Sequence, residues 1–442
     1  MEKINTPRRA PFGSNPKVGE AGRATQQRIL QAAAAAFAEF GYARTSVEAI
    51  TDRAECSRPT FYQYFSGKED IHRQLAARLG FELSDLLRRL DPVTPDIAGR
   101  DVLFDWLREL TAVHERHRAV ADNFSASLRT DDRMLTGATE LSAEYGRALV
   151  RALDLSSVPP LGVDIDILAG AANATSFGAC IYRDRIGEVN ADRLAAALAD
   201  VLHRTFFGPV AGVNLGPKVS SSPSSFPGAA PTPASPDDRP RRKRGVETRK
   251  RLLDAAAIAY GTLGYDAVRV DDIAAEAGTS HGTFYRYFRD KEEVFDEHAD
   301  IATAEVGELL AALPPPPGRE HAWAAAYAAH YERHGGIIDC LRDARAAGVM
   351  GAIRARHQMA NALAAALDTR SFGDTDADVV TCFSLLENVP AATAYGYSGL
   401  TTDQATEVIA TMLGRGMFAH EEPPSASSAH RAKPDQAARR GV

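Results

Sequence analysis

The chain contains Ser57-Arg-Pro-Thr-Phe-Tyr-Gln-Tyr-Phe-Ser-Gly-Lys68, a run that returns later as Ser280-His-Gly-Thr-Phe-Tyr-Arg-Tyr-Phe-Arg-Asp-Lys291. Ser57 and Ser280 are placed to accept a hydrogen bond from the free backbone N–H groups that begin a helix. Phe61 and Phe65 have the spacing that anchors one face of that helix to a core. Lys68 follows a point where a further helix can begin, and a helix N-terminus with a nearby cation suits a phosphate group.

The repeat extends well beyond these two runs. A shift of 223 positions aligns Gly41 with Gly264 and Lys68 with Lys291, and about twenty of forty-seven positions are identical without a gap. Later segments also match, since residues 164–168 parallel residues 376–380 and Phe207 parallels Phe418. The sequence therefore predicts a unit of about 200 residues that occurs twice.

Composition limits the class of protein. The 442 residues are 45% hydrophobic, which is enough for two to four packed units. The net charge is −7, but a DNA-binding protein needs only a local positive surface. Basic residues gather before each motif, namely Arg8, Arg9, Lys17 and Arg23 before the first and Arg239, Arg241, Arg242, Lys243 and Arg244 before the second.

The four cysteines are scattered and form no CxxC pair, which is typical of a reduced protein of the cytoplasm. The sequence has no N-terminal apolar leader and no apolar run of membrane-spanning length. We therefore expect a cytoplasmic protein that has no membrane partner.

Apolar spacing predicts an all-α fold. We expect a first helix from near Thr25 to Gly41, a second opened by a capping box from Thr45 to Glu48, a third over 58–64 and a fourth from Lys68 to Leu90. Further helices are expected near 97–120, 131–155, 163–185 and 190–206. No long stretch alternates with the period of a strand.

Composition also divides the chain into segments. We expect a flexible arm at 1–22, a first DNA-binding domain at 23–84 and a first helical regulatory domain at 85–208. A Pro/Ser-rich linker with a basic end follows at 209–244. The second DNA-binding domain is expected at 245–306, the second regulatory domain at 307–420 and a disordered tail at 421–442.

The spacing of Gly41-Tyr42, Val47, Ile50, Ala54, the 57–65 run and Lys68-Glu69 resembles the helix-turn-helix of TetR-family transcriptional regulators. Residues 264–292 resemble it more closely still, because Gly278 stands where the family has glycine in the turn and copy one has Glu55. The resemblance implies two TetR-like units, each with a three-helix DNA-binding domain followed by a helical domain for ligand binding and dimerisation.

The resemblance also implies contacts with double-stranded DNA. Phosphate contacts would come from Thr45, Ser46, Tyr62, Tyr64 and Lys68, and from Tyr285, Tyr287 and Lys291 in the second copy. Base edges would be reached from Arg58, Pro59, Thr60 and Gln63, and from His281, Gly282, Thr283 and Arg286. Arg286 suits guanine and Gln63 suits adenine. In copy two, Val268-Arg269 replaces Thr45-Ser46, which loses a hydroxyl cap and gains a cation.

The family resemblance further implies a pocket for a small-molecule inducer in each regulatory domain, although core packing explains each candidate residue equally well. The candidates are Trp106, His114, Phe124, Asn173 and Phe177 in the first unit, and Trp323, Tyr327, Tyr331 and Asn388 in the second. His330 and His334 have the i, i+4 spacing of a metal pair, but an exposed or pocket-lining pair is the more common reading. We expect no cofactor, no metal and no enzymatic activity.

The sequence thus favours a sequence-specific transcriptional regulator, a ligand-responsive repressor in which both halves of a dimer lie in one chain. Pairing between two chains, a homodimer, is the alternative assembly. The alternative function is a ligand-binding or interaction protein in which one helix-turn-helix is degenerate. Glu55 and the lost cap at Val268 favour that alternative.

Overall fold

The computed structural model describes residues 19–209 and 243–418, apart from residues 43, 122–127, 129–130, 187–188, 347–349, 371–372, 395 and 397. Within the described residues the fold is helical and contains no strand, which confirms the all-α prediction. The first eighteen residues, most of the expected linker and the expected tail lie outside this description. None of the described helices is long and apolar enough to cross a membrane.

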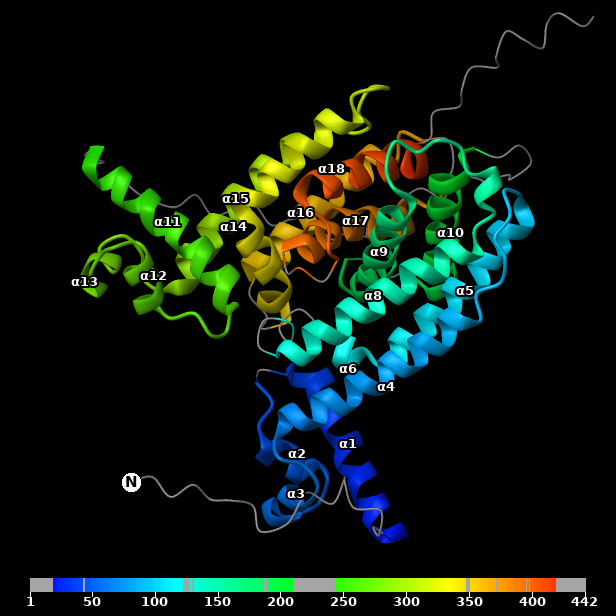
Figure 1. The fold of residues 1–442 in the computed structure, drawn as a ribbon. Coiled ribbons are helices and arrows are strands. Elements are labelled where there is room, and N and C mark those ends of the chain that lie inside the picture. The colour runs from blue at the N-terminus through cyan, green and yellow to red at the C-terminus, as the bar shows by residue number, and fades with distance from the viewer. Residues whose placement is uncertain are drawn as a thin grey trace, which may run out of the picture.

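The two repeats are built from helices in the same order (Figure 1). The helices of the first repeat are α1 (Glu20–Phe40), α2 (Val47–Arg53), α3 (Arg58–Tyr64), α4 (Lys68–Arg88), α5 (Ile97–Arg116), α6 (Arg118–Ala121), α8 (Asp132–Ala152), α9 (Ile165–Ile186) and α10 (Ala191–Phe207). The second repeat has α11 (Lys243–Leu263), α12 (Val270–Glu276), α13 (His281–Phe284), α14 (Lys291–Ala311), α15 (Glu320–Ala346), α16 (Met350–Leu367), α17 (Thr375–Ala394) and α18 (Thr402–Thr411), which runs into a π-helix at Met412–Met417.

Local chemistry explains where the motif helices begin. The Ser57 hydroxyl accepts a hydrogen bond from the Thr60 N–H group at 3.2 Å, and Ser280 does the same for Thr283 at 3.2 Å. Gly41 ends α1 with a φ of 78°, a conformation that glycine adopts without strain. The N-terminal caps at Ser57 and Ser280 and the end of α1 at Gly41 agree with the sequence prediction.

Two details of the first helices differ from expectation. Helix α1 begins at Glu20 rather than near Thr25, and no side chain caps its first turn. Helix α2 is capped by Ser46, whose hydroxyl accepts from the Ala49 N–H group at 3.1 Å, and Thr45 takes no part in the cap. In copy two the hydrogen bond runs the other way along the chain. The side chain of Asp272, inside α12, accepts from the backbone N–H group of Arg269, the residue before the helix, at 2.8 Å.

The turn between the second and third helices has a left-handed residue in both repeats. Gly278 has a φ of 59° in the second copy, and Glu55 has a φ of 49° in the first. Glu55 is the one described residue other than glycine that has a positive φ. The turn expected from the sequence is therefore present in both copies, and in the first copy it carries the steric cost of a β-carbon.

The later helices of the two repeats pack against each other. Helices α9 and α10 contact α17, and α9 also contacts α18 (Figure 1). The Ser384 hydroxyl donates to the Thr175 carbonyl at 2.6 Å. The Arg193 guanidinium binds the Asp374 carboxylate through two contacts of 2.5 and 2.7 Å. These helices share one hydrophobic core, whereas a separate core holds the second helix-turn-helix.

The junction between the repeats contains a reciprocal pair of contacts. The Arg204 guanidinium donates to the Gly416 carbonyl at 2.9 Å, and the Arg415 guanidinium donates to the Thr205 carbonyl at 3.0 Å. Arg204 and Arg415 occupy matching positions, and so do Thr205 and Gly416. Such an exchange is the signature of an interface with two-fold symmetry, and here it forms within a single chain.

Candidate DNA-binding surfaces and ligand cavity

Helix α3 presents one polar face to solvent. Phe61 and Phe65 are fully buried, so they fix the helix on the core of the first helix-turn-helix. The Tyr62 ring is 49% exposed although it is large and aromatic. Other side chains on or beside this face are Arg58, Pro59 and Gln63, which are exposed, and Thr60, which is half-buried. A helix with this arrangement can approach a polyanion without rearranging its core.

Helix α13 repeats this arrangement in a shorter form. Phe284 is buried and Tyr285 is 50% exposed, which closely matches Phe61 and Tyr62. The side chains of His281 and Arg286 are exposed, as is Gly282, and those of Thr283 and Tyr287 are half-buried. The imidazole of His281 contacts the Asp271 carboxylate. Arg269 stays exposed beside the start of α12.

Two predicted contact residues are buried. The Thr45 side chain is 2% exposed, and its hydroxyl donates to the Gly41 carbonyl at 2.8 Å and to the Ala36 carbonyl at 3.2 Å. Tyr64 is 8% exposed because it lies on the core side of α3. Thr45 and Tyr64 are therefore structural residues in this conformation, and Ser46 is the exposed hydroxyl of the first pair.

The lysine that the two copies share has an internal role. The Lys68 ammonium donates to the carbonyls of Tyr42 at 2.9 Å and Thr45 at 3.0 Å, and it lies over the Tyr42 ring. Lys291 makes the equivalent contacts with the carbonyls of Tyr265 at 2.9 Å and Val268 at 3.1 Å. Burial lowers the pKa of the Lys68 ammonium. The lysine thus ties the start of the fourth helix to the loop after the first helix.

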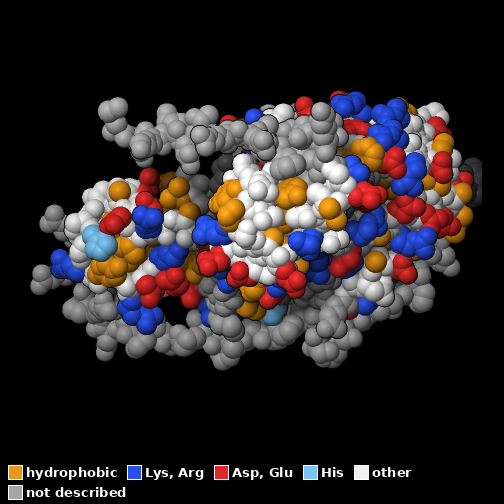
Figure 2. All heavy atoms as spheres, turned by 90° about the horizontal axis from the view of Figure 1, so that it is seen from below, with side chains coloured by type: hydrophobic (Ala, Val, Ile, Leu, Met, Phe, Trp, Pro, Cys, Tyr) orange, Lys and Arg blue, Asp and Glu red, His pale blue; other side chains and the backbone are white. Residues whose placement is uncertain are grey.

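The basic cluster before the second motif falls at the edge of the described chain. Arg241 and Arg242 lie outside the described residues, and Lys243 and Arg244 are described only as the beginning of α11. On the face seen from below, basic and acidic side chains are intermixed over the described surface (Figure 2). On this face, the described side chains therefore form no continuous basic surface.

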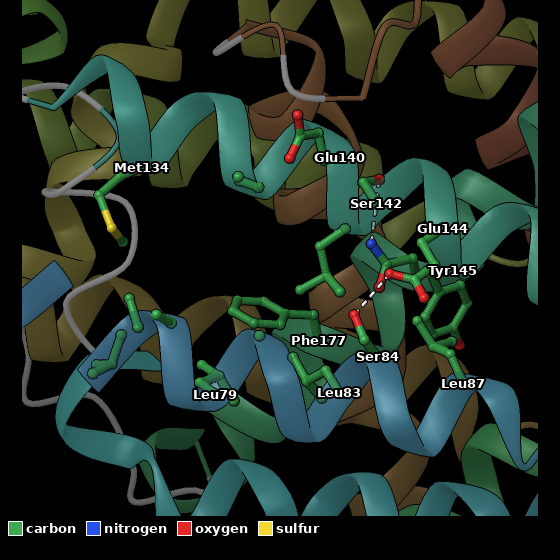
Figure 3. A pocket seen from close by; sticks show the side chains of 18 of the residues that line it. Leu79, Leu83, Ser84, Leu87, Met134, Glu140, Ser142, Glu144, Tyr145 and Phe177 are labelled. Carbon is green, nitrogen blue, oxygen red and sulfur yellow. Dashed lines mark hydrogen bonds between the residues drawn. The ribbon is translucent and has the colours of Figure 1, made fainter. Parts of the chain in front are cut away.

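A cavity of about 410 Å³ lies between helices α4, α5, α8 and α9 of the first repeat (Figure 3). Leu79, Leu83 and Leu87 of α4 form one wall, and Met134 of α8 and Phe177 of α9 also line the cavity. The cavity is mostly apolar, and a few convergent polar groups reach it, which is typical of a small-molecule site. Two polar contacts in its wall are the hydrogen bonds from Ser84 to Glu144 at 2.7 Å and from Asn173 to Ser142 at 3.3 Å.

His114 is the polar group of this cavity that most clearly lacks a partner. Its imidazole is buried, and neither ring nitrogen has a hydrogen-bond partner among the described residues. Its ring lies 4.7 Å from that of Phe177, edge to face. Burial lowers the pKa of His114 to about 3, so the ring stays neutral and keeps one donor and one acceptor. A ligand with a polar group could satisfy either nitrogen.

The predicted pocket residues divide between the two repeats. Trp106, His114, Asn173 and Phe177 all line the cavity, whereas Phe124 lies outside the described residues. In the second repeat, Trp323 and Tyr327 are buried and stacked with ring centroids 5.5 Å apart. Tyr331 is buried and donates to Asp339 at 2.6 Å, and Asn388 is buried at the junction between repeats. The four candidates of the second repeat are therefore packed in the protein interior, and none of them lines the cavity.

The wall formed by α4 was not among the predicted pocket residues. Leu79, Leu83 and Leu87 are spaced four residues apart, a stripe that was visible in the sequence but that core packing explained equally well. The same helix carries Lys68 and the buried Ile71 at its other end, inside the helix-turn-helix. One continuous helix therefore joins the candidate DNA-binding surface to the cavity.

Two segments of the chain match a family of bacterial regulators in sequence. The family model for the DNA-binding region of bacterial regulatory proteins of the tetR family matches residues 29–75 and again residues 252–298. The HTH-type transcriptional regulator YdgC of Bacillus subtilis (strain 168) is 43% identical over 72 residues, 16% of this chain and 37% of that protein. The regulator AcrR of Shigella flexneri is 31% identical over 71 residues, 16% of this chain and 33% of that protein.

The chain therefore spans about a third of the length of the curated relatives it matches. Among solved structures, a transcriptional regulator (TerR/AcrR family) from Aquifex aeolicus VF5 aligns over 41% of this chain and 99% of its own, with 21% identity and a TM-score of 0.33. SmeT, the repressor of the Stenotrophomonas maltophilia multidrug efflux pump SmeDEF, aligns over 40% of this chain and 87% of its own, with 25% identity and a TM-score of 0.33.

Proposed function

We propose that the chain is a regulator of the TetR family, whose model matches it twice, and that it is a ligand-responsive transcriptional repressor that acts as a single-chain pseudo-dimer. Its targets would be a double-stranded DNA operator and a small-molecule inducer. We further propose the domain boundaries given by the sequence, with linker 209–244 between the two units.

The observation that carries this proposal is the reciprocal junction. Arg204 and Arg415 each reach a carbonyl of the opposite repeat, as two subunits of a dimer would. One chain then supplies both helix-turn-helix units, with exposed Tyr62 in one and exposed Tyr285 in the other. Because Gln63 and Arg286 differ at matching positions, the two half-sites of the operator need not be alike.

Helix α4 supports the proposed response to ligand. A molecule in the cavity would press on Leu79, Leu83 and Leu87, while Lys68 at the other end of α4 holds the loop that leads into α2. A rigid helix transmits a shift along its length, so filling the cavity would reorient the first helix-turn-helix. The ligand would be largely apolar with one polar group for His114.

The assembly is tested by light scattering of the purified chain together with a footprint on DNA selected from a random pool. We expect the mass of one chain and protection of two unlike half-sites about ten base pairs apart. A stable two-chain particle on a repeated palindrome would show that like halves pair between chains, and the pseudo-dimer would be abandoned.

The ligand response is tested by screening apolar metabolites for a rise in melting temperature. If both sites bias one equilibrium, the same compound must lower the affinity for DNA. A compound that stabilises the protein and leaves the affinity for DNA unchanged would indicate ligand sequestration.

A second candidate is a protein in which one helix-turn-helix no longer binds DNA. It is favoured by Glu55, whose carboxylate and left-handed backbone stand in the turn before α3. A gel shift at low and moderate salt with each half disabled in turn separates the two candidates. Loss of binding only when the second copy is disabled would support the degenerate first copy.

A further inference from the structure

Three histidines and one glutamate converge behind the second helix-turn-helix. His298 and Glu305 come from α14, and His330 and His334 come from α15. The three imidazoles are buried, with 5%, 1% and 6% of their surface exposed, so of the exposed or pocket-lining pair that the sequence favoured, the exposed form does not hold for His330 and His334. The carboxylate side chain of Glu305 is 39% exposed and opens the cluster to solvent.

A chain of hydrogen bonds fixes the protonation of two of these rings. The Leu253 carbonyl, which can only accept, lies 3.1 Å from Nδ1 of His298, so this nitrogen carries a proton. When His298 is neutral, its Nε2 accepts from Nδ1–H of His334, 3.0 Å away. The lone pair on Nε2 of His334 then faces Oε2 of Glu305 at 3.1 Å. Two electron pairs at that distance require a cation, either a proton or a metal ion.

His330 provides a third possible ligand atom, its Nδ1. Its Nδ1 lies 3.8 Å from Oε2 of Glu305, too far for a hydrogen bond, and neither ring nitrogen has a hydrogen-bond partner among the residues that the structure describes. The donor atoms of Glu305, His330 and His334 all lie within 4.8 Å of one another. Tetrahedral zinc holds neighbouring ligand atoms about 3.3 Å apart, which small side-chain rotations would achieve here.

The first repeat provides an internal comparison. Trp106 donates to the Leu86 carbonyl at 3.0 Å, and Trp323 donates to the Leu309 carbonyl at 2.8 Å, which aligns α5 with α15. On this alignment His117 matches His334, and Nε2 of His117 lies 2.8 Å from Oε1 of Glu82, the counterpart of Glu305. The carboxylate–imidazole pair is therefore common to both repeats.

The other two histidines occur only in the second repeat. His330 stands where the first repeat has Val113, and His298 stands where it has Leu75. Both apolar counterparts are buried, so the fold is satisfied by hydrocarbon at these positions. The second repeat thus replaces two core hydrocarbons with imidazoles, one beside the Glu305 carboxylate and one hydrogen-bonded to His334, a substitution that packing alone does not require.

We propose that Glu305, His330 and His334 bind a divalent transition-metal ion, with Zn²⁺ the best match, and that His298 orients His334. Imidazole and carboxylate ligands suit Zn²⁺, and a fourth position remains for water on the exposed side of Glu305. His298 is a positioning residue, since its Nε2 accepts a hydrogen bond from Nδ1–H of His334 and so leaves Nε2 of His334 free for the ion. The ion would join α14 to α15 where both contact α11 of the second helix-turn-helix (Figure 1).

One neighbouring cation competes with the ion. The Arg333 guanidinium lies 3.2 Å from Oε2 of Glu305, the same oxygen that the histidines face. Its side chain is 62% exposed and can swing into solvent when the ion arrives. Replacing Arg333 with alanine should therefore strengthen metal binding, a result that a purely structural role of the cluster does not predict.

The test is titration of the full chain, free of any affinity tag, with Zn²⁺ by calorimetry and with Co²⁺ by visible absorption. We expect one high-affinity ion per chain and a Co²⁺ spectrum with nitrogen and oxygen ligands. His330→Val and His298→Leu install the residues of the first repeat, so both variants should fold. His330→Val should weaken binding at least tenfold, and His298→Leu should weaken it about 10- to 100-fold.

His117→Ala is the matched control, because it removes the counterpart histidine from the first repeat, and it should bind Zn²⁺ as the parent chain does. The proposal is overturned if the parent chain binds no ion. It is also overturned if His330→Val and Glu305→Gln bind as tightly as the parent chain.

Discussion

Gly178 of α9 faces Asn388 of α17 so closely that a β-carbon on Gly178 would lie 2.0 Å from the Asn388 side-chain nitrogen. The Ser384 hydroxyl would lie 2.4 Å from the same β-carbon. Both neighbours are buried, and the Ser384 hydroxyl already donates to the Thr175 carbonyl. The two repeats therefore meet at a point that only glycine fits.

We expect Gly178→Ala to destabilise the chain by about 1–3 kcal/mol, because the added methyl group forces buried polar side chains apart. Gly170→Ala on the same helix is the matched control. A β-carbon there meets nothing within 4 Å, so it should stabilise the helix by roughly 0.5–1 kcal/mol. Urea denaturation of both variants measures the difference, and equal midpoints would show that the repeats do not meet as described.

Glu55 offers a second test, this time of backbone strain. Glu55→Gly should raise the free energy of unfolding by about 1 kcal/mol, because it removes a β-carbon from a left-handed conformation. Gly278→Glu introduces the same strain in the second copy and should lower the free energy by a similar amount. Thermal denaturation of the two variants should therefore give shifts of opposite sign, and shifts of the same sign would be inconsistent with this turn geometry.

Base recognition is assigned to the exposed side chains that differ between copies. Gln63→Ala should relax base choice in one half-site and Arg286→Ala in the other, each by roughly 1–3 kcal/mol at one position. Selection of bound sequences from a random DNA pool would show which half-site changes. If both variants relaxed the same half-site, the assignment of one copy to each half-site would fail.

Lys68→Met probes the internal role of the lysine. The variant loses the contacts with the Tyr42 and Thr45 carbonyls, so the first helix-turn-helix should become less stable and the affinity for every DNA sequence should fall. The slope of log affinity against log salt should stay unchanged, because the ammonium binds carbonyls rather than a phosphate. A slope reduced by about 0.9 would instead restore the phosphate contact expected from the family resemblance.

His114 should make stability depend on pH. Burial lowers its pKa to about 3 in the folded chain, against about 6.5 when unfolded, so protonation favours the unfolded state. Stability should be constant above pH 6.5 and should fall as the pH drops from about 6.5 toward 3.

His114→Phe should make this decline shallower. His72, whose pKa burial lowers to about 4, accounts for part of the remaining decline. Urea denaturation at several pH values measures both slopes. Identical slopes for the parent chain and the variant would mean that His114 titrates normally.

The sequence predicted the parts of the molecule that local rules control. Helix caps at Ser57 and Ser280, the glycine stop at Gly41 and the repeat itself follow from short-range chemistry, and the structure agrees. It could not predict that Thr45 turns inward, because its neighbour Ser46 is an equally good cap. The difference between the two repeats could not be predicted either. Trp106 lines a cavity while Trp323 is stacked in a packed core, and this contrast depends on neighbours distant in sequence.

Because the contacts of Arg204 and Arg415 join two repeats of one chain, the pairing of the repeats does not depend on protein concentration. Two separate subunits assemble in proportion to the square of their concentration, so a scarce regulator of that kind falls apart before it reaches its operator. A junction inside one polypeptide has no such threshold, because the effective concentration of one half near the other is in the millimolar range whatever the number of molecules in the cell. Occupancy of the operator would then rise linearly with copy number, and a few molecules would suffice for a graded response.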